Sequence, residues 1–345
     1  MTDTAAAILS SWAEAEGGCL TPITTGLINV TYRVDAPKGR FSLQRLAPIF
    51  GREVHADIDA VTSHLASKGL TTPRLILTRA GTLDAEAPDG VWRLMTWIDG
   101  QCHNHLTDTE SARQAGLLLG KFHRGLADFD EPLHHQRLGV HDTPQHLRGL
   151  REALATYTDH ADFEDIRLLG EAILEAAEAL SPLPAVPERI VHGDPKISNL
   201  LFDDGGEGVA LIDLDTIARM PLPLELGDAF RSWCNPRGED ASAAQFDLEL
   251  FEGAMAGYAA ATRDQLSNEE REALVIGAQT IMVELAARFC RDALEDRYFG
   301  WDRQRFPSRS AHNRVRAAGQ LALAADLARH RADAEGAVTR AFTSG

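Results

Sequence analysis

The stretch that decides the fold reads VHGDPKISNLLF from residue 191 to residue 202. An apolar strand leads into this stretch, and a second apolar segment, residues 209–212, runs directly into Asp213. Asp194 and Asn199 lie five residues apart in the loop between the strands. Short apolar runs bounded by turn residues predict buried strands, so two adjacent strand ends would bring these polar side chains together.

This spacing matches the loop with which kinases transfer a phosphoryl group. In the pattern H-R-D-x-x-x-x-N, the Asp orients the attacking hydroxyl and the Asn binds metal, as does the Asp of D-F-G. The pattern therefore predicts Asp194 as the catalytic base and Asn199 and Asp213 as Mg²⁺ ligands. Each residue alone is equally typical of a turn or a loop cap, so the prediction depends on their combination. His192 is interpreted as a structural residue that holds the loop.

Composition limits the classes of function. The 345 residues carry a formal charge of −17 and are 44% hydrophobic, which predicts a folded core and excludes nucleic acid as a partner. The N-terminus has no basic segment, and no apolar run is long enough to span a membrane, so we expect a cytoplasmic protein with no membrane contact. The four cysteines form no C-x-x-C pair and are predicted to be reduced core residues, namely Cys19, Cys102, Cys234 and Cys290.

The hydrophobic pattern changes near residue 100. Before it, alternation predicts a hairpin over residues 30–46, a helix over 54–68, and strands at 74–77 and 91–95. These elements form a small β-rich lobe with one helix.

After Gly100, helical periodicity dominates. Thr107 and Glu110 predict a capping box for a helix that runs to Phe129, and further helices are expected over residues 166–180 and 241–335. The expected fold class is α+β, with a small N-terminal lobe, residues 1–99, and a larger, mostly helical lobe, residues 100–345, that carries the loop and the acceptor site.

The sequence resembles the aminoglycoside phosphotransferase and choline kinase superfamily, in which H-G-D replaces H-R-D. Within it, several strings are similar to N-acetylhexosamine 1-kinases, and they span nearly the whole chain. These strings are GLINVTYRV from residue 26, LQR from 43, VTSHL from 61, HDTP from 141, ELAARF from 284, and the segment from Tyr298 to Arg314.

This resemblance implies a bilobal protein-kinase-like fold, ATP and Mg²⁺ as co-substrates, and phosphorylation of an amino-sugar hydroxyl such as the anomeric one. It assigns Asp194, Asn199 and Asp213 the same roles as the spacing does. Asp215 would either bind a second metal or order the loop. The loop from Gly26 would cover the phosphates, with donor amides at the positions Asn29, Val30 and Thr31; a plain hairpin turn is the alternative.

The sequence departs from the superfamily on the third strand, where a Lys normally reaches the phosphates. Gln44 occupies that register, and Arg45 follows it. Alternation places Leu43 and Arg45 on one face and Gln44 on the other, which favours Gln44 as an uncharged donor to phosphate. The acidic partner on the next helix is left open among three residues, which are equally typical of a solvated face: Glu53, Asp57 and Asp59.

The segment from Trp92 to Gly100 resembles an interlobe hinge. An extended hinge offers backbone groups to the edge of adenine while apolar side chains enclose the ring. Thr96 and Ile98 are predicted to make the backbone contacts, and Met95 is predicted to line the back of the nucleotide pocket.

The acceptor site is expected to face Asp194 from the helices after residue 225. Glu284 and Arg288 lie four residues apart on one helix face, which fits an ion pair and acceptor binding equally well. Arg231 is the third candidate for acceptor binding, and Asp228 is expected to brace the loop. His141 and Asp142 are interpreted as a helix start, with sugar contact as the alternative.

The function predicted from the sequence is ATP-dependent phosphorylation of a small-molecule hydroxyl, with an amino sugar as the acceptor. Alternatives are the same chemistry on an aminoglycoside, choline or homoserine, and a nucleotide-binding module without transfer. No particular oligomeric state is predicted.

Overall fold

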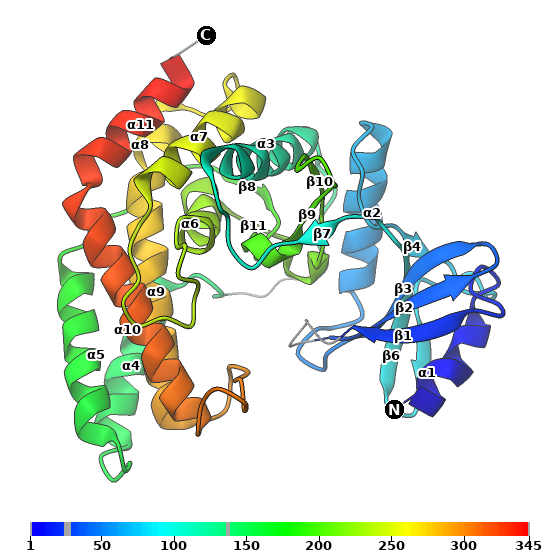
Figure 1. Ribbon diagram of the computed structural model, residues 1–345, viewed down its shortest axis with the longest axis horizontal. Helices are drawn as coiled ribbons and strands as arrows, with labels where there is room; N and C mark the ends of the chain where they lie inside the picture. The colour runs from blue at the N-terminus through cyan, green and yellow to red at the C-terminus, as the bar shows by residue number, and fades with distance from the viewer. Residues whose placement is uncertain (1, 24–28, 136–138, 344–345) are drawn as a thin grey trace.

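A curved antiparallel sheet and a large helical assembly occupy opposite ends of the molecule (Figure 1). The computed structural model describes residues 2–23, 29–135 and 139–343. The first sheet has the strand order β1-β2-β3-β6-β4, and β5 pairs with β6. Its strands are β1 (Cys19–Ile23), β2 (Val30–Ala36), β3 (Gly39–Arg45), β4 (Leu75–Ile76), β5 (Ala85–Ala87) and β6 (Gly90–Thr96).

The two faces of this sheet differ in chemistry because side chains alternate along each strand. One face is apolar and packs beneath α1 (Thr2–Ile8) and the turn Leu9–Ser11. Its buried members include Trp12, Tyr32, Leu43 and Leu94. The opposite face carries Thr31, Gln44 and Arg93 on neighbouring strands and is turned toward the second lobe, as the contact between Arg93 and Asp215 shows.

The local elements expected for this lobe are present. Strands β2 and β3 form the hairpin, in register from Val30 opposite Arg45 to Ala36 opposite Gly39. The expected helix is α2 (Val54–Ser67), which stands between the sheet and the second lobe in Figure 1. The N-terminal helix, β1 and β5 carry no strong periodicity of their own and were not predicted.

The second lobe combines two small sheets with a helical assembly. One sheet has the order β10-β9-β7, and β11 pairs with β8. The strands are β7 (Gln101–Cys102), β8 (Glu188–Val191), β9 (Leu200–Phe202), β10 (Gly208–Leu211) and β11 (Ala218–Pro221). The helices are α3 (Thr109–Gly125), α4 (Thr143–Thr156), α5 (Phe163–Glu178), α6 (Leu222–Trp233), α7 (Leu248–Thr262), α8 (Asn268–Glu272), α9 (Leu274–Glu295), α10 (Arg309–Arg329) and α11 (Arg331–Thr343).

Helices α3 and α7 pack with their backbones in direct contact. A Cβ atom at Gly116 would lie 1.9 Å from the carbonyl oxygen of Ala254, and one at Gly257 would lie 1.9 Å from that of Arg113. Gly120 and Gly253 line the same contact between the helices. Glycine is therefore required here by the close approach of the two backbones.

The α+β class and the two-lobed, kinase-like arrangement agree with the prediction from the sequence. The division between residues 99 and 100 stays a prediction; β6 ends at Thr96 in the first sheet, and β7 begins at Gln101 in the second lobe. Within the described part of the chain, no helix is both long and apolar enough to cross a membrane.

Two expectations about local structure were wrong. The capping box of α3 is formed by Asp108 and Ser111, because Asp108 accepts from the Ser111 amide at 2.8 Å. Thr107 only donates a hydrogen bond to the Asp108 carboxylate. Cys234 and Cys290 are buried as expected, but the other two cysteines, Cys19 and Cys102, are exposed because they lie on edge strands.

Candidate active site

The loop between β8 and β9 brings Asp194 and Asn199 into contact. The Asn199 side-chain amide donates to the Asp194 carbonyl oxygen at 2.9 Å and to its carboxylate at 3.2 Å. The turn Ile197–Asn199 folds the chain back to make this contact possible. Lys196 lies on the other side, with its Nζ 2.5 Å from the Asp194 carboxylate. The predicted catalytic carboxylate is therefore held between an amide and an ammonium group.

Helix α6 fixes the backbone of this loop at four points. The carboxylate of Glu225 accepts the amides of His192 at 2.9 Å and of Gly193 at 3.0 Å. The Ser232 hydroxyl accepts the amide of Ile197 at 3.0 Å, and the Trp233 indole donates to the Pro195 carbonyl at 2.9 Å. Satisfied buried donors of this kind rigidify a loop, because leaving them unpaired is costly.

His192 serves the loop backbone, as interpreted from the sequence. Its Nε2 lies 2.8 Å from the Ile212 carbonyl, and its Nδ1 accepts the amide of Asp194 at 3.3 Å. This pair of partners defines a neutral ring with the proton on Nε2. Gly193 has a φ of 82°, and a Cβ there would lie 2.0 Å from the Thr216 carbonyl, so only glycine fits.

Asp213 and Asp215 follow β10 on a short helical turn, Leu214–Thr216, and differ in their contacts. Asp213 takes a left-handed conformation, and its carboxylate makes no hydrogen bond or ion pair with the described residues. Asp215 is 1% exposed and is held by the Asn29 amide at 2.6 Å and by the Arg93 guanidinium. These contacts favour an ordering role for Asp215 over a second metal site.

The local charges of the loop suit a bound cation. Burial, followed by the neighbouring Asp215, raises the pKa of Asp213. Burial also acts to raise the pKa of Asp194, but the charge and hydrogen bond of Lys196, together with the charges of His192 and Arg231, outweigh it and the pKa falls. Asp213 thus offers an unpartnered oxygen close to other carboxylates, and oxygen ligands are what Mg²⁺ prefers. Among the residues that the structure describes, no three His, Cys, Asp or Glu side chains form a metal site, so the amide oxygen of Asn199 would be needed.

The predicted phosphate loop is only partly described, because residues 24–28 lie outside the described residues. Val30 and Thr31 belong to strand β2, where they pair with Arg45 and Gln44. The Asn29 side chain is engaged on both ends, since it accepts the amide of Ala47 at 2.9 Å and donates to Asp215. Asn29 therefore contacts the Asp215 turn through its side chain.

Gln44 faces the interlobe side and Arg45 the other side, as alternation predicts. The Gln44 amide donates to the Thr31 hydroxyl at 3.3 Å, whereas Arg45 pairs with Asp89 at 3.1 Å. No acidic residue of α2 pairs with this position in the described structure. Asp57 is buried and accepts the amides of His134 and His135, Glu53 is exposed, and Asp59 is half-buried.

The two residues predicted to contact adenine differ in their backbone hydrogen bonds. The Thr96 amide donates to the Arg74 carbonyl at 2.8 Å, so this amide already has a partner, and the predicted backbone contacts of Thr96 and Ile98 with adenine stay predictions. Ile98 makes no backbone hydrogen bond with the described residues. Met95 is buried in the large core that joins the lobes, consistent with a place at the back of the cleft.

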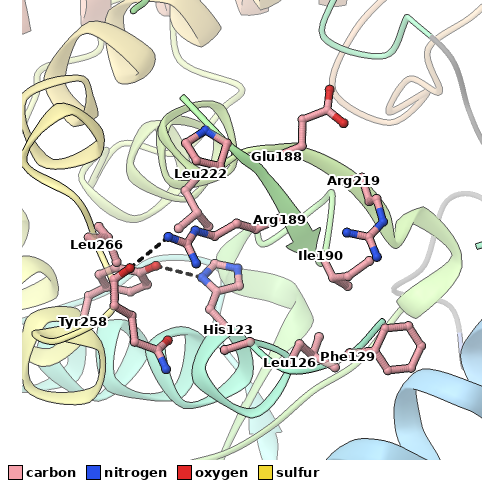
Figure 2. Close-up of a pocket in the computed structure, with 13 residues that line it drawn as sticks. His123, Leu126, Phe129, Glu188, Arg189, Ile190, Arg219, Leu222, Tyr258 and Leu266 are labelled. Atoms are coloured by element: carbon pink, nitrogen blue, oxygen red, sulfur yellow. Dashed lines mark hydrogen bonds between the residues drawn. The ribbon is translucent and has the colours of Figure 1, made fainter. Parts of the chain in front are cut away.

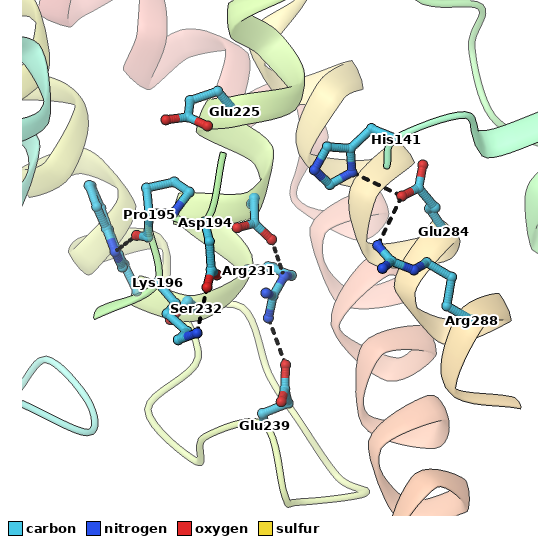
Figure 3. A network of polar contacts seen from close by, with 12 residues as sticks. His141, Asp194, Pro195, Lys196, Glu225, Arg231, Ser232, Glu239, Glu284 and Arg288 are labelled. Carbon is cyan, nitrogen blue, oxygen red and sulfur yellow. Dashed lines mark hydrogen bonds and ion pairs between the residues drawn. The ribbon is translucent and has the colours of Figure 1, made fainter. Parts of the chain in front are cut away.

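A second polar group surrounds Glu284 on α9 (Figure 3). Glu284 has no exposed surface, and its carboxylate contacts the His141 ring at 2.9 Å, the Thr143 hydroxyl at 2.6 Å and Arg288 at 3.6 Å. Burial acts to raise the pKa of Glu284, but the hydrogen bonds from His141 and Thr143 and the charges of His141 and Arg288 together outweigh it and the pKa falls. Asp142 caps α4 as interpreted, accepting the Gln145 amide at 2.9 Å.

Arg231 lies between the loop and this group in Figure 3. Arg231 donates to Asp228 at 2.7 Å and to Glu239 at 2.8 Å. Burial, partly offset by Arg231, raises the pKa of Asp228, and the charges of both Asp194 and His141 act on it. The predicted acceptor residues therefore form two buried groups next to the loop, with Arg231 in one and Glu284 and Arg288 in the other.

Asp194 lines neither of two cavities found near the loop in the described part of the chain. One has a volume of about 390 Å³ and is lined in part by His141, Gly193 and Thr216. The other, of about 180 Å³, is drawn in Figure 2 and lies against His123 and Arg189.

Several residues that shape the site were missed in the sequence. Glu225, Ser232 and Trp233 are far from the loop in sequence, and nothing local marks their contacts. Lys196 is within the motif itself, and its charge two residues from Asp194 was a usable signal. Arg93 lies within the segment predicted as the hinge, although a charged residue in an apolar strand is itself a signal of a buried polar partner.

The two lobes and the loop at their junction define a kinase-like protein. The family model described as "Phosphotransferase enzyme family" matches residues 20–263. The chain belongs to this family and is a phosphotransferase that acts on a small-molecule hydroxyl.

Relatives are similar over nearly the full length. A homoserine kinase from Hyphomonas neptunium is 26% identical over 333 residues, which cover 94% of this chain and 93% of the relative. Among solved structures, an amicoumacin kinase in complex with AMP-PNP and Ca²⁺ has a TM-score of 0.63 at 14% identity, covering 93% of this chain and 92% of its own. An aminoglycoside phosphotransferase from Alicyclobacillus acidocaldarius has a TM-score of 0.62 at 18% identity, covering 96% of each chain.

Proposed function

We propose that this protein transfers the γ-phosphoryl group of ATP, with Mg²⁺, to a hydroxyl of an amino sugar, with the anomeric hydroxyl of an N-acetylhexosamine as the acceptor. The observation that carries the proposal is the grouping of Asp194, Asn199 and an unpartnered Asp213 in a loop whose backbone is fixed by α6. A binding module without transfer has no physical need of this grouping.

Asp194 orients the acceptor hydroxyl in this proposal and takes its proton. Its lowered pKa keeps it ionised at neutral pH, so it can accept a hydrogen bond from the hydroxyl. The acceptor oxygen forms a bond to the γ-phosphorus while the bond from that phosphorus to the bridging oxygen breaks, leaving ADP. Lys196 lies where it can balance negative charge beside Asp194 during this exchange.

Asn199 and Asp213 are the residues that would hold Mg²⁺. When bound, the metal ion neutralises charge on the phosphates. Asn199 already lies against Asp194, so metal ligand and base would share one rigid support.

ATP is proposed to lie against the hinge and the interlobe face of the first sheet. Ile98 offers the open backbone groups, Met95 lines the back of the pocket, and the donors near the phosphates come from Gln44 and the start of β2. Thr96 would contribute through its carbonyl group, because its amide donates to the Arg74 carbonyl and its hydroxyl accepts the Arg74 amide at 2.9 Å.

The acceptor is proposed to bind between Asp194 and the His141–Glu284–Arg288 group. Glu284 is fully buried, so it acts on the acceptor through His141 and Arg288, which it positions. Arg231 is held by the carboxylates of Asp228 and Glu239 and would contact the acceptor from the side of the Asp194 loop. Sites built from buried hydrogen-bonding groups discriminate strongly among hydroxyl compounds, which fits a sugar. The likeness of six sequence strings to N-acetylhexosamine 1-kinases supports the choice of sugar.

Homoserine is the second candidate acceptor, because a homoserine kinase is 26% identical over 94% of this chain. ADP release should be measured with ATP and Mg²⁺ across N-acetylglucosamine, N-acetylgalactosamine, homoserine, choline and an aminoglycoside, with phosphorus NMR of each active mixture. We expect a signal only with the N-acetylhexosamines and an anomeric phosphate in the product. Turnover with homoserine alone would replace the sugar proposal, and release without any acceptor preference would contradict both.

A further inference from the structure

Three adjacent strands of the first sheet place one side chain each in a row on the interlobe face. Thr31 on β2 lies directly opposite Gln44 on β3, and Gln44 lies directly opposite Arg93 on β6. Residues opposite each other in antiparallel strands share a face of the sheet. This Thr31–Gln44–Arg93 row therefore runs across the face that is turned toward the second lobe.

Arg93 determines how Gln44 is oriented. The guanidinium donates to the Gln44 side-chain oxygen from Nε at 2.9 Å and from Nη2 at 2.7 Å. Because this oxygen is occupied, the amide group of Gln44 is turned toward Thr31, to which it donates at 3.3 Å. The row thus presents the donor end of Gln44, supported by a charge on the next strand.

The other end of the guanidinium crosses to the second lobe. Arg93 holds both oxygens of Asp215, with Nη2 3.0 Å from Oδ2, and both side chains are only 1% exposed. The two residues are 122 positions apart in the chain. A bidentate pair of this kind has a fixed geometry as well as charge complementarity. A buried charge left without its partner would be costly, so the pair joins the lobes at a defined distance.

In the described structure, the Asp215 carboxylate is held by this pair and by the hydrogen bond from Asn29, and both contacts come from the first lobe. The Asp213 carboxylate, two residues earlier, has no hydrogen bond or ion pair with the described residues. Asp215 belongs to the same short turn as Asp213, and the left-handed conformation of Asp213 begins that turn. A shift of the backbone at Asp215 would therefore be passed along this turn to Asp213. Asn29, at the start of β2, reinforces the same anchor at 2.6 Å.

We infer that Arg93 is a positioning residue that sets the metal-binding carboxylate of Asp213 from the nucleotide-facing sheet, through its ion pair with Asp215. The uncharged Gln44 is accommodated because the positive charge for this face comes from the neighbouring strand. The inference rests on the proposed function, in which Asp213 binds Mg²⁺ and this face binds the phosphates.

The direct test measures ADP binding by calorimetry, with Mg²⁺ and with EDTA, for the wild type, Arg93→Met, Arg93→Lys and Asp215→Asn. We expect the gain in affinity that Mg²⁺ gives the wild type to fall at least tenfold in Arg93→Met and Asp215→Asn, with the EDTA measurement of each variant as its own baseline. Arg93→Lys keeps the charge and should retain part of the gain. The matched control is Arg45→Met, which removes an arginine from the other face of the same sheet, where it pairs with Asp89.

A relocation experiment separates positioning from simple stabilisation. Gln44→Lys places an ammonium directly opposite position 93, so in the Arg93→Met background it should restore part of the Mg²⁺-dependent affinity. In the wild type the same change should weaken it, because Lys and Arg93 would repel each other.

Each outcome decides between specific statements. If Arg93→Met and Asp215→Asn lower only the unfolding temperature and keep the Mg²⁺-dependent gain, or if Gln44→Lys restores nothing, the inference is wrong. If either variant does not fold, Arg93→Lys decides, since a purely structural ion pair predicts an unchanged Mg²⁺-dependent gain. If the wild type itself shows no such gain, the proposed function fails, which is a separate result.

Discussion

Two glutamates with no exposed surface, Glu225 on α6 and Glu284 on α9, are used in opposite ways. Glu225 accepts two backbone amides of the loop, from His192 and Gly193. Glu284 instead contacts side chains: the ring of His141, the hydroxyl of Thr143 and the guanidinium of Arg288.

The difference teaches how such a protein can keep its chemistry while its acceptor changes. Backbone partners are the same whatever side chains the loop carries, so Glu225 fixes geometry independently of the substrate. Side-chain partners can be replaced one at a time, so the surroundings of Glu284 can vary without disturbing the loop. Under the proposed function, the first glutamate controls the rate and the second controls acceptor affinity.

The largest expected effect on the rate is at Asp194, whose loop is held by Glu225. Asp194→Asn removes the proton acceptor while keeping the shape, and kcat should fall about 10³-fold. Steady-state kinetics measures this, with the exposed Asp204→Asn as the control, because Asp204 lies beyond the loop in the β9–β10 turn. A rate within tenfold of the wild type would exclude Asp194 as the base.

Glu225→Gln tests whether the first glutamate controls the rate by holding the loop backbone. One backbone amide would then face an amide instead of an oxygen, at a cost of about 1–3 kcal/mol in the free energy of unfolding. A displaced loop should lower kcat by about 10²-fold. We expect the acceptor KM to change little, as kinetics on the variant would show. The exposed Glu249→Gln on α7 is the control, and an effect on KM alone would reverse the roles assigned to the two glutamates.

Glu284→Gln should act mainly on acceptor binding. Loss of the charge that orients His141 and Arg288 weakens a charge-assisted hydrogen bond, and the acceptor KM should rise about tenfold with the nucleotide KM unchanged. Glu295→Gln provides the control, because Glu295 also pairs with arginine near the end of α9. Equal changes in both KM values would contradict a role confined to the acceptor.

The smallest expected effect is the pH dependence of stability at Glu284. The pKa of Glu284 is lowered in the folded protein from its ordinary 4.5, so its contribution to stability is present above about pH 4.5 and is lost as pH falls through the folded pKa. The difference in free energy of unfolding between wild type and Glu284→Gln, measured by denaturant titration from pH 7 to pH 3, should therefore shrink on acidification. A difference that grows toward low pH would mean that the carboxyl is buried in its neutral form.

The sequence alone predicted the elements that depend on local pattern. The hairpin of β2 and β3, helix α2 and the strands around the loop follow from periodicity and turn residues. The pairing of Asp194 with Asn199 follows from their spacing, because a tight turn of three residues closes the interval between them. Strand alternation also predicts that the side chains of Gln44 and Arg45 lie on different faces of the sheet.

Contacts between distant segments could not be predicted in the same way. The support of the loop by Glu225 spans 32 to 33 residues and depends on how α6 packs. The ion pair of Arg93 with Asp215 joins two lobes, and the Thr96 amide donates to the carbonyl of Arg74, directly before β4. The capping box of α3 failed by one position at each end, because an Asp and a Ser next to the expected residues fit the cap geometry better.

The glycine contact between α3 and α7 has a consequence for engineering. Replacing a helical glycine by alanine is a usual way to raise stability, by roughly 0.4–1 kcal/mol at sites that can accept it. At Gly116 and Gly257 the new methyl group would meet a carbonyl oxygen at 1.9 Å, so the same change would force two helices apart. A thermostabilised version of this enzyme should keep both glycines, while the exposed glycines with open space around them, such as Gly69 and Gly81, need their left-handed backbone rather than room.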